Sequence, residues 1–407
     1  MTETTLRIEV APGFGDIARA AWDGVANPGW VMKPGGQLEG SGPAPFNPFL
    51  THDFLVSLED SGSATEKTGW SPCPILIRNA SDAVVGAAPV YLKSHSQGEY
   101  VFDHGWAEAF HRAGGRYYPK LQVSVPFTPV PGPRLLVAPG PDAPLIRAQL
   151  VKALVQLARG AGASSVHATF LTPEDRDTFV AGRFLERTDR QFHWQDAGYG
   201  DFEGFLAALS SRKRKQIRRE RRDALAGDLA IRWLTGDAIQ PEHWDAFFAF
   251  YTDTGDRKWG RPYLNRRFFT LIGERMAHRV ALCLAYDGER PIAGALNFIG
   301  SDTLYGRYWG ALEERPFLHF EVCYYQAIDF ALAHGLAHVE AGAQGEHKLF
   351  RGYLPVETRS AHWIAHPGLR AAVADYLVRE RAAVADERAE LADLAPFRRD
   401  TAPDDGD

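Results

Sequence analysis

The sequence predicts an α/β protein made of two related domains, each a mixed sheet flanked by helices. The chain has 407 residues, of which 45% are hydrophobic and 24% are charged, so it is long and apolar enough to bury two cores of ordinary size. A pattern of hairpin, helix and strand also occurs twice along it, as a duplicated α/β module would show. We therefore expect domains at 1–195 and 196–395, followed by a flexible tail at 396–407.

Each unit begins with a predicted β-hairpin. Residues 75–92 and 281–299 both read as strand, polar turn and strand, and Gly86 aligns with Gly294. The Asp287-Gly288 pair is a strong signal for a tight hairpin turn, and residues 79–82 give a looser one.

A helix and a strand complete each unit. Residues 154–166 and 328–339 both read as an apolar helix closed by glycine and followed by a strand. This alignment places His167 opposite Glu340. The alternative to duplication is a chance similarity between two ordinary α/β patterns.

The first unit also contains an insertion within residues 93–141. Its segment 125–133 is too rich in proline for a helix or a central strand, and the insertion is too aromatic for a disordered linker. We expect an ordered loop that covers a groove and brings Tyr118 and Lys120 to a substrate. The alternative is an aromatic plug that seals the interface between the domains.

The end of the chain is predicted to be helical. Residues 369–393 are rich in alanine, glutamate and arginine, which favours a terminal helix before the tail.

Composition excludes several classes of partner and site. The net charge of −6 gives no global attraction to DNA or to an anionic membrane, and no apolar run is long enough to cross a bilayer. Three widely spaced cysteines in apolar surroundings favour neither a disulfide nor a metal site. No secretion signal begins the sequence, so we expect a soluble cytoplasmic protein without membrane insertion. The oligomeric state is left open.

Any contact with a polyanion must therefore be local, and one segment is suited to it. Eight basic residues and one acid lie between Arg212 and Arg222, on a helix that Ser210 or Ser211 can cap. An ideal helix places Lys213, Gln216, Ile217 and Glu220 on one face. The candidate polyanion-binding residues on it are Arg212, Arg214, Arg218, Arg221 and Arg222. The alternative is a solvated helix that pairs with acids of the other domain.

The most informative segment is 340–355, where acidic, basic, amide and imidazole groups lie between glycines after an apparent buried strand. Glycines let the backbone approach a ligand closely, and the cations suit phosphate or carboxylate oxygens. The candidate binding residues here are Gln344, Gly345, His347, Lys348, Arg351 and Gly352. The alternative is a polar surface turn.

Together with residues 306–310, 318–321 and 117–121, this segment resembles the FemAB-like branch of the GNAT acyltransferase superfamily, and the resemblance covers nearly the whole chain. It implies tandem GNAT-like domains and a peptidoglycan-related role; Fem-type enzymes move amino acids from charged tRNA to cell-wall precursors. Such enzymes end their core with an aromatic, a cation and a glycine-aromatic pair, to which residues 350–353 are similar. Because Lys348 precedes the aromatic residue, the family cation falls to either Lys348 or Arg351.

The segment 251–264 resembles a substrate-lining segment of the same family. It contributes Arg257, Lys258 and Trp259 as candidate binding residues. The alternative is that Arg261 stacks on Trp259.

GNAT-type transfer is a direct attack of an amine on a carbonyl, and it needs a base, donors for the oxyanion and a proton for the leaving group. The candidate bases are Glu340, Glu346, Glu321, His319 and His347, and Tyr308 is the chosen proton donor. Glu321 begins a predicted helix, where it has the alternative role of a cap. Arg307 and Trp309 flank Tyr308 and are expected to bind substrate.

These patterns predict an N-acyltransferase or aminoacyltransferase without a tightly bound cofactor. Acyl-CoA or aminoacyl-tRNA would be the co-substrate, and an amine, such as a small molecule, peptide or peptidoglycan precursor, the acceptor. The residues around Gln344 match the usual coenzyme A loop poorly, which lowers the odds for acetyl-CoA. The alternative function is a non-catalytic module that recognises a peptide or glycan.

Overall fold

The predicted α/β class is confirmed by the computed structural model, which describes residues 6–258, 262–342 and 345–398, and for 256–258 the backbone alone. Its large mixed sheet runs in the order β12 (Leu229–Thr235), β13 (Val280–Asp287), β14 (Arg290–Ile299), β15 (Thr303–Ala311), β16 (His338–Glu340), β11 (Leu185–Gln195), β17 (Leu354–Ile364), β10 (Ser165–Thr169), β8 (Lys120–Val123), β7 (Val90–Lys93) and β4 (Trp70–Pro72). A smaller sheet runs β1 (Arg7–Val10), β5 (Ile75–Arg78), β6 (Val84–Ala88), β9 (Leu136–Val137), and a ribbon pairs β2 (Trp30–Met32) with β3 (Leu38–Gly40).

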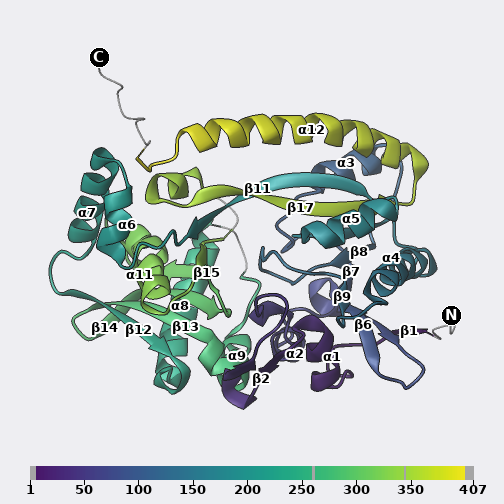
Figure 1. The fold of residues 1–407 in the computed structure, drawn as a ribbon, viewed down its shortest axis with the longest axis horizontal. Coiled ribbons are helices and arrows are strands. Elements are labelled where there is room, and N and C mark those ends of the chain that lie inside the picture. Colours follow the sequence, from purple (N-terminus) through teal and green to yellow (C-terminus); the bar gives the residue numbers. More distant parts are fainter. Residues whose placement is uncertain (1–5, 259–261, 343–344, 399–407) are drawn as a thin grey trace.

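Helices cover both faces of the large sheet (Figure 1). They are α1 (Arg19–Ala26), α2 (His52–Asp60), α3 (His104–Arg112), α4 (Ala143–Gly160), α5 (Pro173–Ala181), α6 (Phe202–Ala208), α7 (Ser211–Ala224), α8 (Pro241–Lys258), α9 (Arg266–Met276), α10 (Leu318–Phe320), α11 (Gln326–Ala333) and α12 (Pro367–Asp393). A π-helical turn, Glu321–Tyr325, joins α10 to α11, and a 3₁₀ turn, Glu346–Arg351, precedes β17.

The repeated pattern forms the local structures that it predicts. β5 pairs with β6 and β13 with β14, both antiparallel, and Gly288 takes a positive φ of 61° in the second turn. Gly162 and Gly335, at φ 63° and 65°, follow the ends of α4 and α11. Each unit also contains one parallel pair of strands connected through a helix, β8 with β10 and β15 with β16.

The last strands of the two units are exchanged. β11 follows β10 in sequence but pairs with β16, whereas β17 follows β16 but pairs with β10. β11 and β17 also pair with each other, from Leu185 opposite His362 to His193 opposite Leu354. The long helix α12, predicted at residues 369–393, packs along these two strands (Figure 1). The large sheet is therefore continuous between the units, and the domain boundary at 195 stays a prediction.

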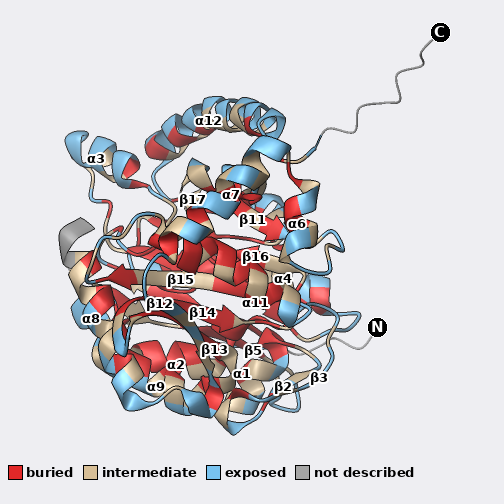
Figure 2. Ribbon diagram, turned by 90° about the vertical axis from the view of Figure 1, so that its left-hand side faces the viewer, coloured by how far each residue is buried: buried red, intermediate tan, exposed pale blue. Residues whose placement is uncertain are grey.

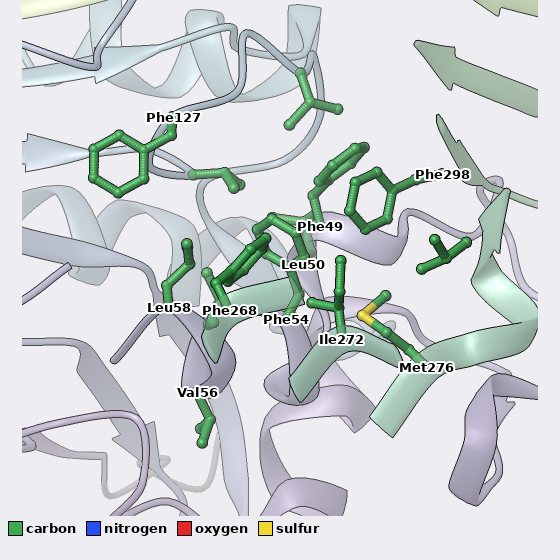
Figure 3. Close-up of a cluster of buried hydrophobic side chains, with 14 of the residues drawn as sticks. Phe49, Leu50, Phe54, Val56, Leu58, Phe127, Phe268, Ile272, Met276 and Phe298 are labelled. Carbon is green, nitrogen blue, oxygen red and sulfur yellow. The ribbon is translucent and has the colours of Figure 1, made fainter. Parts of the chain in front are cut away.

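An aromatic cluster joins the N-terminal residues to the C-terminal unit (Figure 3). The Phe49 ring lies 4.7 Å from that of Phe298 on β14, and Phe54 on α2 lies 5.8 Å from Phe268 on α9, between ring centroids. All four side chains are almost fully buried, as are most of the strands around them (Figure 2). Burying four phenylalanines contributes on the order of 10 kcal/mol to holding the segments together.

The insertion at 93–141 differs from the expected ordered loop, because it contains α3, β8 and β9. In its proline-rich part, Phe127 is buried and its ring stacks on that of Tyr263, with centroids 5.0 Å apart. The Phe127 carbonyl accepts a hydrogen bond from Tyr308, and that of Pro129 accepts one from Gln191. These contacts support the alternative of an aromatic plug between the units.

We expect Gly310→Ala to destabilise the protein by about 2 kcal/mol or more. A Cβ at this position of β15 would lie 2.2 Å from the backbone carbonyl of Phe250 in α8, which cannot move aside as a flexible side chain can. Gly105→Ala is the matched control, since a Cβ there meets nothing within 4 Å. Urea unfolding of both variants checks this, and equal midpoints would contradict it.

Across the described residues, no helix combines the length and the apolar character that crossing a membrane requires.

Candidate active site

A pocket opens where β15 and β16 part. The two strands pair in parallel only from Thr303 and His338 to Tyr305 and Glu340, and beyond that point the chain leaves the sheet while β15 continues. The pocket has a volume of about 300 Å³. It is lined by Ala295, Asn297, Gly306, Arg307, Tyr308, Trp309, His319, Cys323, Tyr324, Ala341, His347 and Lys348. The structure thus brings together six of the predicted site residues: Arg307, Tyr308, Trp309, His319, His347 and Lys348.

Lys348 is the most unusual group of this pocket. Its side chain is buried, and its Nζ donates to the carbonyl oxygen of Gly342 at 2.9 Å. Burial, reinforced by the charge of Arg307, lowers the pKa of Lys348 to about 7. A lysine near neutrality can change its charge in response to a substrate. Because Lys348 and Arg351 are both buried, segment 346–351 is not a solvated turn.

Three glycines of segment 340–355 have a positive φ, which glycine adopts more readily than other residues. Gly342, Gly345 and Gly352 have φ of 78°, 114° and 88°, in the left-handed region that other residues rarely occupy. At Gly352 a Cβ would also lie 2.7 Å from the Phe205 ring, so Gly352 acts through its backbone conformation and packing.

Glu340 ends β16 as expected, but its carboxylate is engaged by Arg307. The two side chains form an ion pair at 2.7 Å and are 10% and 1% exposed. The Arg307 guanidinium also lies over the rings of Phe49 and Tyr305. Because its carboxylate is paired with Arg307, Glu340 fixes Arg307 beside the pocket rather than standing free as a base.

Tyr324 and His347 form a hydrogen-bonded pair within the pocket. The Tyr324 hydroxyl lies 2.9 Å from Nε2 of His347. Burial, with the charges of Arg351 and Lys348, lowers the pKa of His347, so its imidazole is neutral at pH 7. Burial raises the pKa of Tyr324, which keeps its hydroxyl protonated. The pair therefore offers a proton acceptor next to a proton donor.

Arg351 lies outside the pocket and connects it to the basic helix α7. Its guanidinium pairs with Glu220 of α7 at 2.9 Å, donates to the His347 carbonyl at 2.7 Å, and lies 3.5 Å from the Phe320 ring centroid. Of the two candidates for the family cation, only Lys348 lines the pocket, and Arg351 holds the turn that carries it.

Three of the predicted acid–base residues have other surroundings. Glu321 has no exposed side-chain surface and pairs with Arg221 at 3.0 Å, so it is neither a pocket base nor a simple helix cap. Glu346 is 67% exposed and lies 3.8 Å from Arg190, away from the pocket lining. Tyr308 lines the pocket, but its hydroxyl donates to the Phe127 carbonyl at 2.7 Å, so its proton is held in that hydrogen bond rather than free for the leaving group.

Tyr118 and Lys120 do not reach the pocket. Lys120 is buried within a separate polar cluster, where its Nζ donates to Glu99 at 2.7 Å and to Asp103 at 2.5 Å. The Tyr118 hydroxyl lies 2.8 Å from that of Ser96, next to the same cluster. Both belong to the strand β8 region, on the far side of β11 and β17 in the sheet order.

Four predicted binding residues lie outside what the structure describes. These are Arg257 and Lys258, of which the backbone alone is described, and Trp259 and Gln344.

Sequence reasoning missed several residues of the site. Tyr324 lies in the π-helical turn, which brings it to the pocket beside His319. Asn297 sits opposite Gly306 at an irregularity in the pairing of β14 with β15, and it could have been noticed as a polar residue within an apolar strand. His193 of β11 lies opposite Glu340, a cross-strand neighbour that no local pattern reveals.

The basic helix begins at Ser211, and Ser210 makes no side-chain capping bond. On the face that carries Lys213, Gln216, Ile217 and Glu220, the last two are buried and the first two are half-buried. Arg218, Arg221 and Arg222 pair with acids, namely Glu203, Glu321 with Asp329, and Asp223. These acids lie in residues 203–329, not in the other unit as the alternative supposed. No ion pair joins Arg212 or Arg214 to a residue that the structure describes, so these two remain the candidates for an external anion.

A family model described as FemAB-like, peptidoglycan biosynthesis/recognition, matches residues 14–399. No curated protein matches the chain.

Similar solved structures include FemX, at 12% identity, with a TM-score of 0.48, over 77% of this chain and 92% of that one. L-PGS from Bacillus licheniformis is similar at 9% identity and a TM-score of 0.47, over 83% and 99%. A tandem GNAT protein from the clavulanic acid biosynthesis pathway is similar at 13% identity and a TM-score of 0.42, over 89% and 98%.

Proposed function

Because this chain belongs to the FemAB-like family of peptidoglycan biosynthesis and recognition proteins, we propose that it transfers an acyl or aminoacyl group from an activated donor to an amine. The acceptor would be a peptidoglycan precursor or a related amine or peptide, and the reaction would take place in the cytoplasm. The observation that carries the proposal is the pocket between β15 and β16, which places Lys348 beside the Tyr324–His347 pair.

The pocket residues supply the groups that direct transfer needs. As the amine nitrogen bonds to the donor carbonyl carbon, the carbonyl electrons move to oxygen, and the attacking nitrogen must lose a proton. Neutral His347 accepts that proton. When the oxyanion collapses and expels the leaving group, Tyr324 donates its proton to the departing oxygen or sulfur and recovers one from His347 across their hydrogen bond.

Lys348 stabilises the oxyanion. Its lowered pKa has a catalytic consequence, because a negative charge that develops nearby raises the pKa and favours the protonated ammonium. The interaction is then stronger in the transition state than with the neutral carbonyl of the bound donor, which is the condition for raising kcat.

The donor is an acyl-CoA thioester or an aminoacyl-tRNA, and both are anionic. Helix α7 suits either, since Glu220 and Arg351 tie it to the turn that carries His347 and Lys348, and Lys213 lies 3.9 Å from the Phe350 ring. An anion held by Arg212 or Arg214 would therefore lie on the helix that is joined to this turn.

Donor binding and transfer test the proposal together. We expect acetyl-CoA, a long-chain acyl-CoA or total charged tRNA to raise the melting temperature by a few degrees, since saturation at a hundred times Kd adds about 2.7 kcal/mol. Mass spectrometry of an amine acceptor should then show the mass of the added group. Tyr324→Phe should retain donor binding but lose transfer. Acceptor binding without transfer from any donor would instead support a peptide- or glycan-recognition module.

The pH dependence of kcat/KM should identify the charge state of Lys348. Transfer requires neutral His347 and protonated Lys348, so activity should fall in acid as His347 gains a proton and fall above about pH 7 as Lys348 loses one. In Lys348→Arg the guanidinium stays protonated, so this alkaline fall should disappear. The acceptor amine titrates identically in both proteins, and the ratio of the two profiles isolates Lys348. If the ratio of wild-type to Lys348→Arg kcat/KM stayed constant between pH 6 and 9, Lys348 would not act as a protonated donor to the oxyanion.

A further inference from the structure

A second pocket lies at the other end of β15 from the candidate active site. It has a volume of about 700 Å³, and its walls come from the β2–β3 ribbon, the end of β12, the 3₁₀ turn before β13, the β14–β15 turn and the end of α11. Gly300 in this turn is separated from Gly306, the first residue of β15 that lines the first pocket, by at most roughly 20 Å along the chain. The two pockets therefore lie along different parts of the β14–β15 pair, and on β14 their nearest lining residues, Asn297 and Ile299, are two residues apart.

The lining of this pocket carries positive and neutral groups only. It includes the guanidinium of Arg279 and the imidazoles of His278 and His334, and none of its described lining residues bears a carboxylate. The protein as a whole has a net charge of −6, so a cavity lined by an arginine and by no acid differs in charge from the rest of the molecule. Such a lining complements an anion.

Arg279 has no internal partner to explain its position. Its Nε is buried without a hydrogen-bond partner, and no ion pair or hydrogen bond joins the guanidinium to a residue that the structure describes. Burial lowers the pKa of Arg279, with no acid to offset the effect. Arg279 is half-buried, and leaving its buried Nε without a partner costs free energy that a bound anion would offset.

His278 is equally unpaired and is held in place. Within the described residues no hydrogen bond reaches its ring, which lies between two glycines of different segments: a Cβ on Gly236 would be 2.7 Å from its Cε1, and one on Gly35 would be 3.9 Å from its Cδ2. The ring can thus present a nitrogen to the pocket beside Arg279.

The pocket also has aromatic walls. The rings of Phe330 and His334 stack with centroids 3.9 Å apart, and Trp30 lines the side formed by the β2–β3 ribbon. A cavity of this volume suits a ligand larger than a free ion, and flat aromatic surfaces suit a ring on that ligand.

We propose that this second pocket binds a small phosphorylated ligand of nucleotide size, with Arg279 and His278 as donors to its phosphate oxygens. A guanidinium is the side chain best matched to phosphate, because its planar fork forms two parallel hydrogen bonds. The ring of the ligand would pack against Trp30 or against the Phe330–His334 stack. The proposal does not depend on transfer at the first pocket.

Calorimetric titration of the full chain with inorganic phosphate, ADP and adenosine tests it. We expect ADP to bind more tightly than phosphate, and adenosine to bind at least roughly tenfold more weakly than ADP, since the charge-assisted bonds are lost. Arg279→Met should weaken ADP binding by roughly tenfold or more. Arg290→Met is the matched control, because that arginine is exposed and pairs with Glu313 on the surface, and it should bind ADP as the wild type does.

A second variant protects the test against misfolding of Arg279→Met. Thr235 is exposed at the rim of the pocket, so Thr235→Glu should fold and should repel the phosphate, whereas Thr235→Gln should bind normally. Lys348→Met should retain ADP binding, which separates this site from the first pocket. The proposal is overturned if ADP gives no binding heat at millimolar concentration, if adenosine binds as tightly as ADP, or if Arg279→Met and Thr235→Glu leave the affinity unchanged.

Discussion

Replacing Lys348 with methionine is expected to lower the rate of transfer by roughly 10²- to 10³-fold, the usual cost of removing one donor to an oxyanion. Methionine keeps most of the volume and the apolar stem of the lysine but cannot donate a hydrogen bond. Lys152→Met on α4 is the control, since that lysine is exposed and lies outside the pocket. Retention of full activity by Lys348→Met would exclude Lys348 from the reaction.

The same substitution should stabilise the fold, by on the order of 2–4 kcal/mol at pH 7. The pKa of Lys348 is about 7 in the folded protein and has its ordinary value near 10.5 in the unfolded chain. Between these values the unfolded state binds more protons, so the penalty that Lys348 imposes is full below about pH 7 and disappears as the pH rises toward 10.5.

The stabilisation by Lys348→Met should accordingly be largest at or below neutral pH and should become smaller at alkaline pH. Urea unfolding at pH 6.5 and pH 9.5 measures it. A variant that is inactive and also less stable would show that Lys348 is a structural residue.

Lys120→Met is expected to have the opposite effect on stability, with a loss of about 3–5 kcal/mol. Lys120 is fully buried between the carboxylates of Glu99 and Asp103, each only 2% exposed, and its removal leaves both acids buried without their main partner. Arg112→Met is the control, because its partner Glu108 is 68% exposed and such surface pairs contribute about 0–1 kcal/mol.

The loss of stability in Lys120→Met should be larger near neutral pH than in acid. Burial alone would raise the pKa of Asp103, but Lys120 and His167 overcome this and hold it below the ordinary value. A lowered carboxyl pKa contributes stability that is present above the unfolded pKa and is lost as the pH falls through the folded one. The difference in unfolding free energy between the wild type and Lys120→Met should therefore be largest near neutral pH and smallest below about pH 4. A difference that stays constant with pH would contradict this account of the cluster.

The sequence predicted those parts of the fold that depend on neighbours along the chain. The turn at Asp287-Gly288, the glycines after α4 and α11, and the end of a strand at Glu340 all carry local signals, and all three lie where expected. The exchange of β11 and β17 could not be predicted, because strand pairing between residues 185 and 362 leaves no trace in either segment alone.

The candidate site shows the same limit. The residue types of segment 340–355 indicated a binding loop, and three of its residues, Ala341, His347 and Lys348, line the pocket. The partners were not predictable: Arg307 pairs with Glu340, Glu220 pairs with Arg351, and the Phe127 carbonyl accepts a hydrogen bond from Tyr308. Each of these contacts joins two elements that are distant in sequence, and each determines whether a side chain is available to contact a substrate.

The strand exchange also sets the order in which a growing chain can complete its structure on the ribosome. β10 ends at Thr169, but the edge that it offers to β17 has no partner until residue 364 has been made. At translation rates of about 5–20 residues per second, the N-terminal unit exposes that edge for roughly 10–40 s. β11 waits somewhat less long for β16 and β17, so during synthesis the first unit is a nascent chain with two open sheet edges, the kind of surface that chaperones cover.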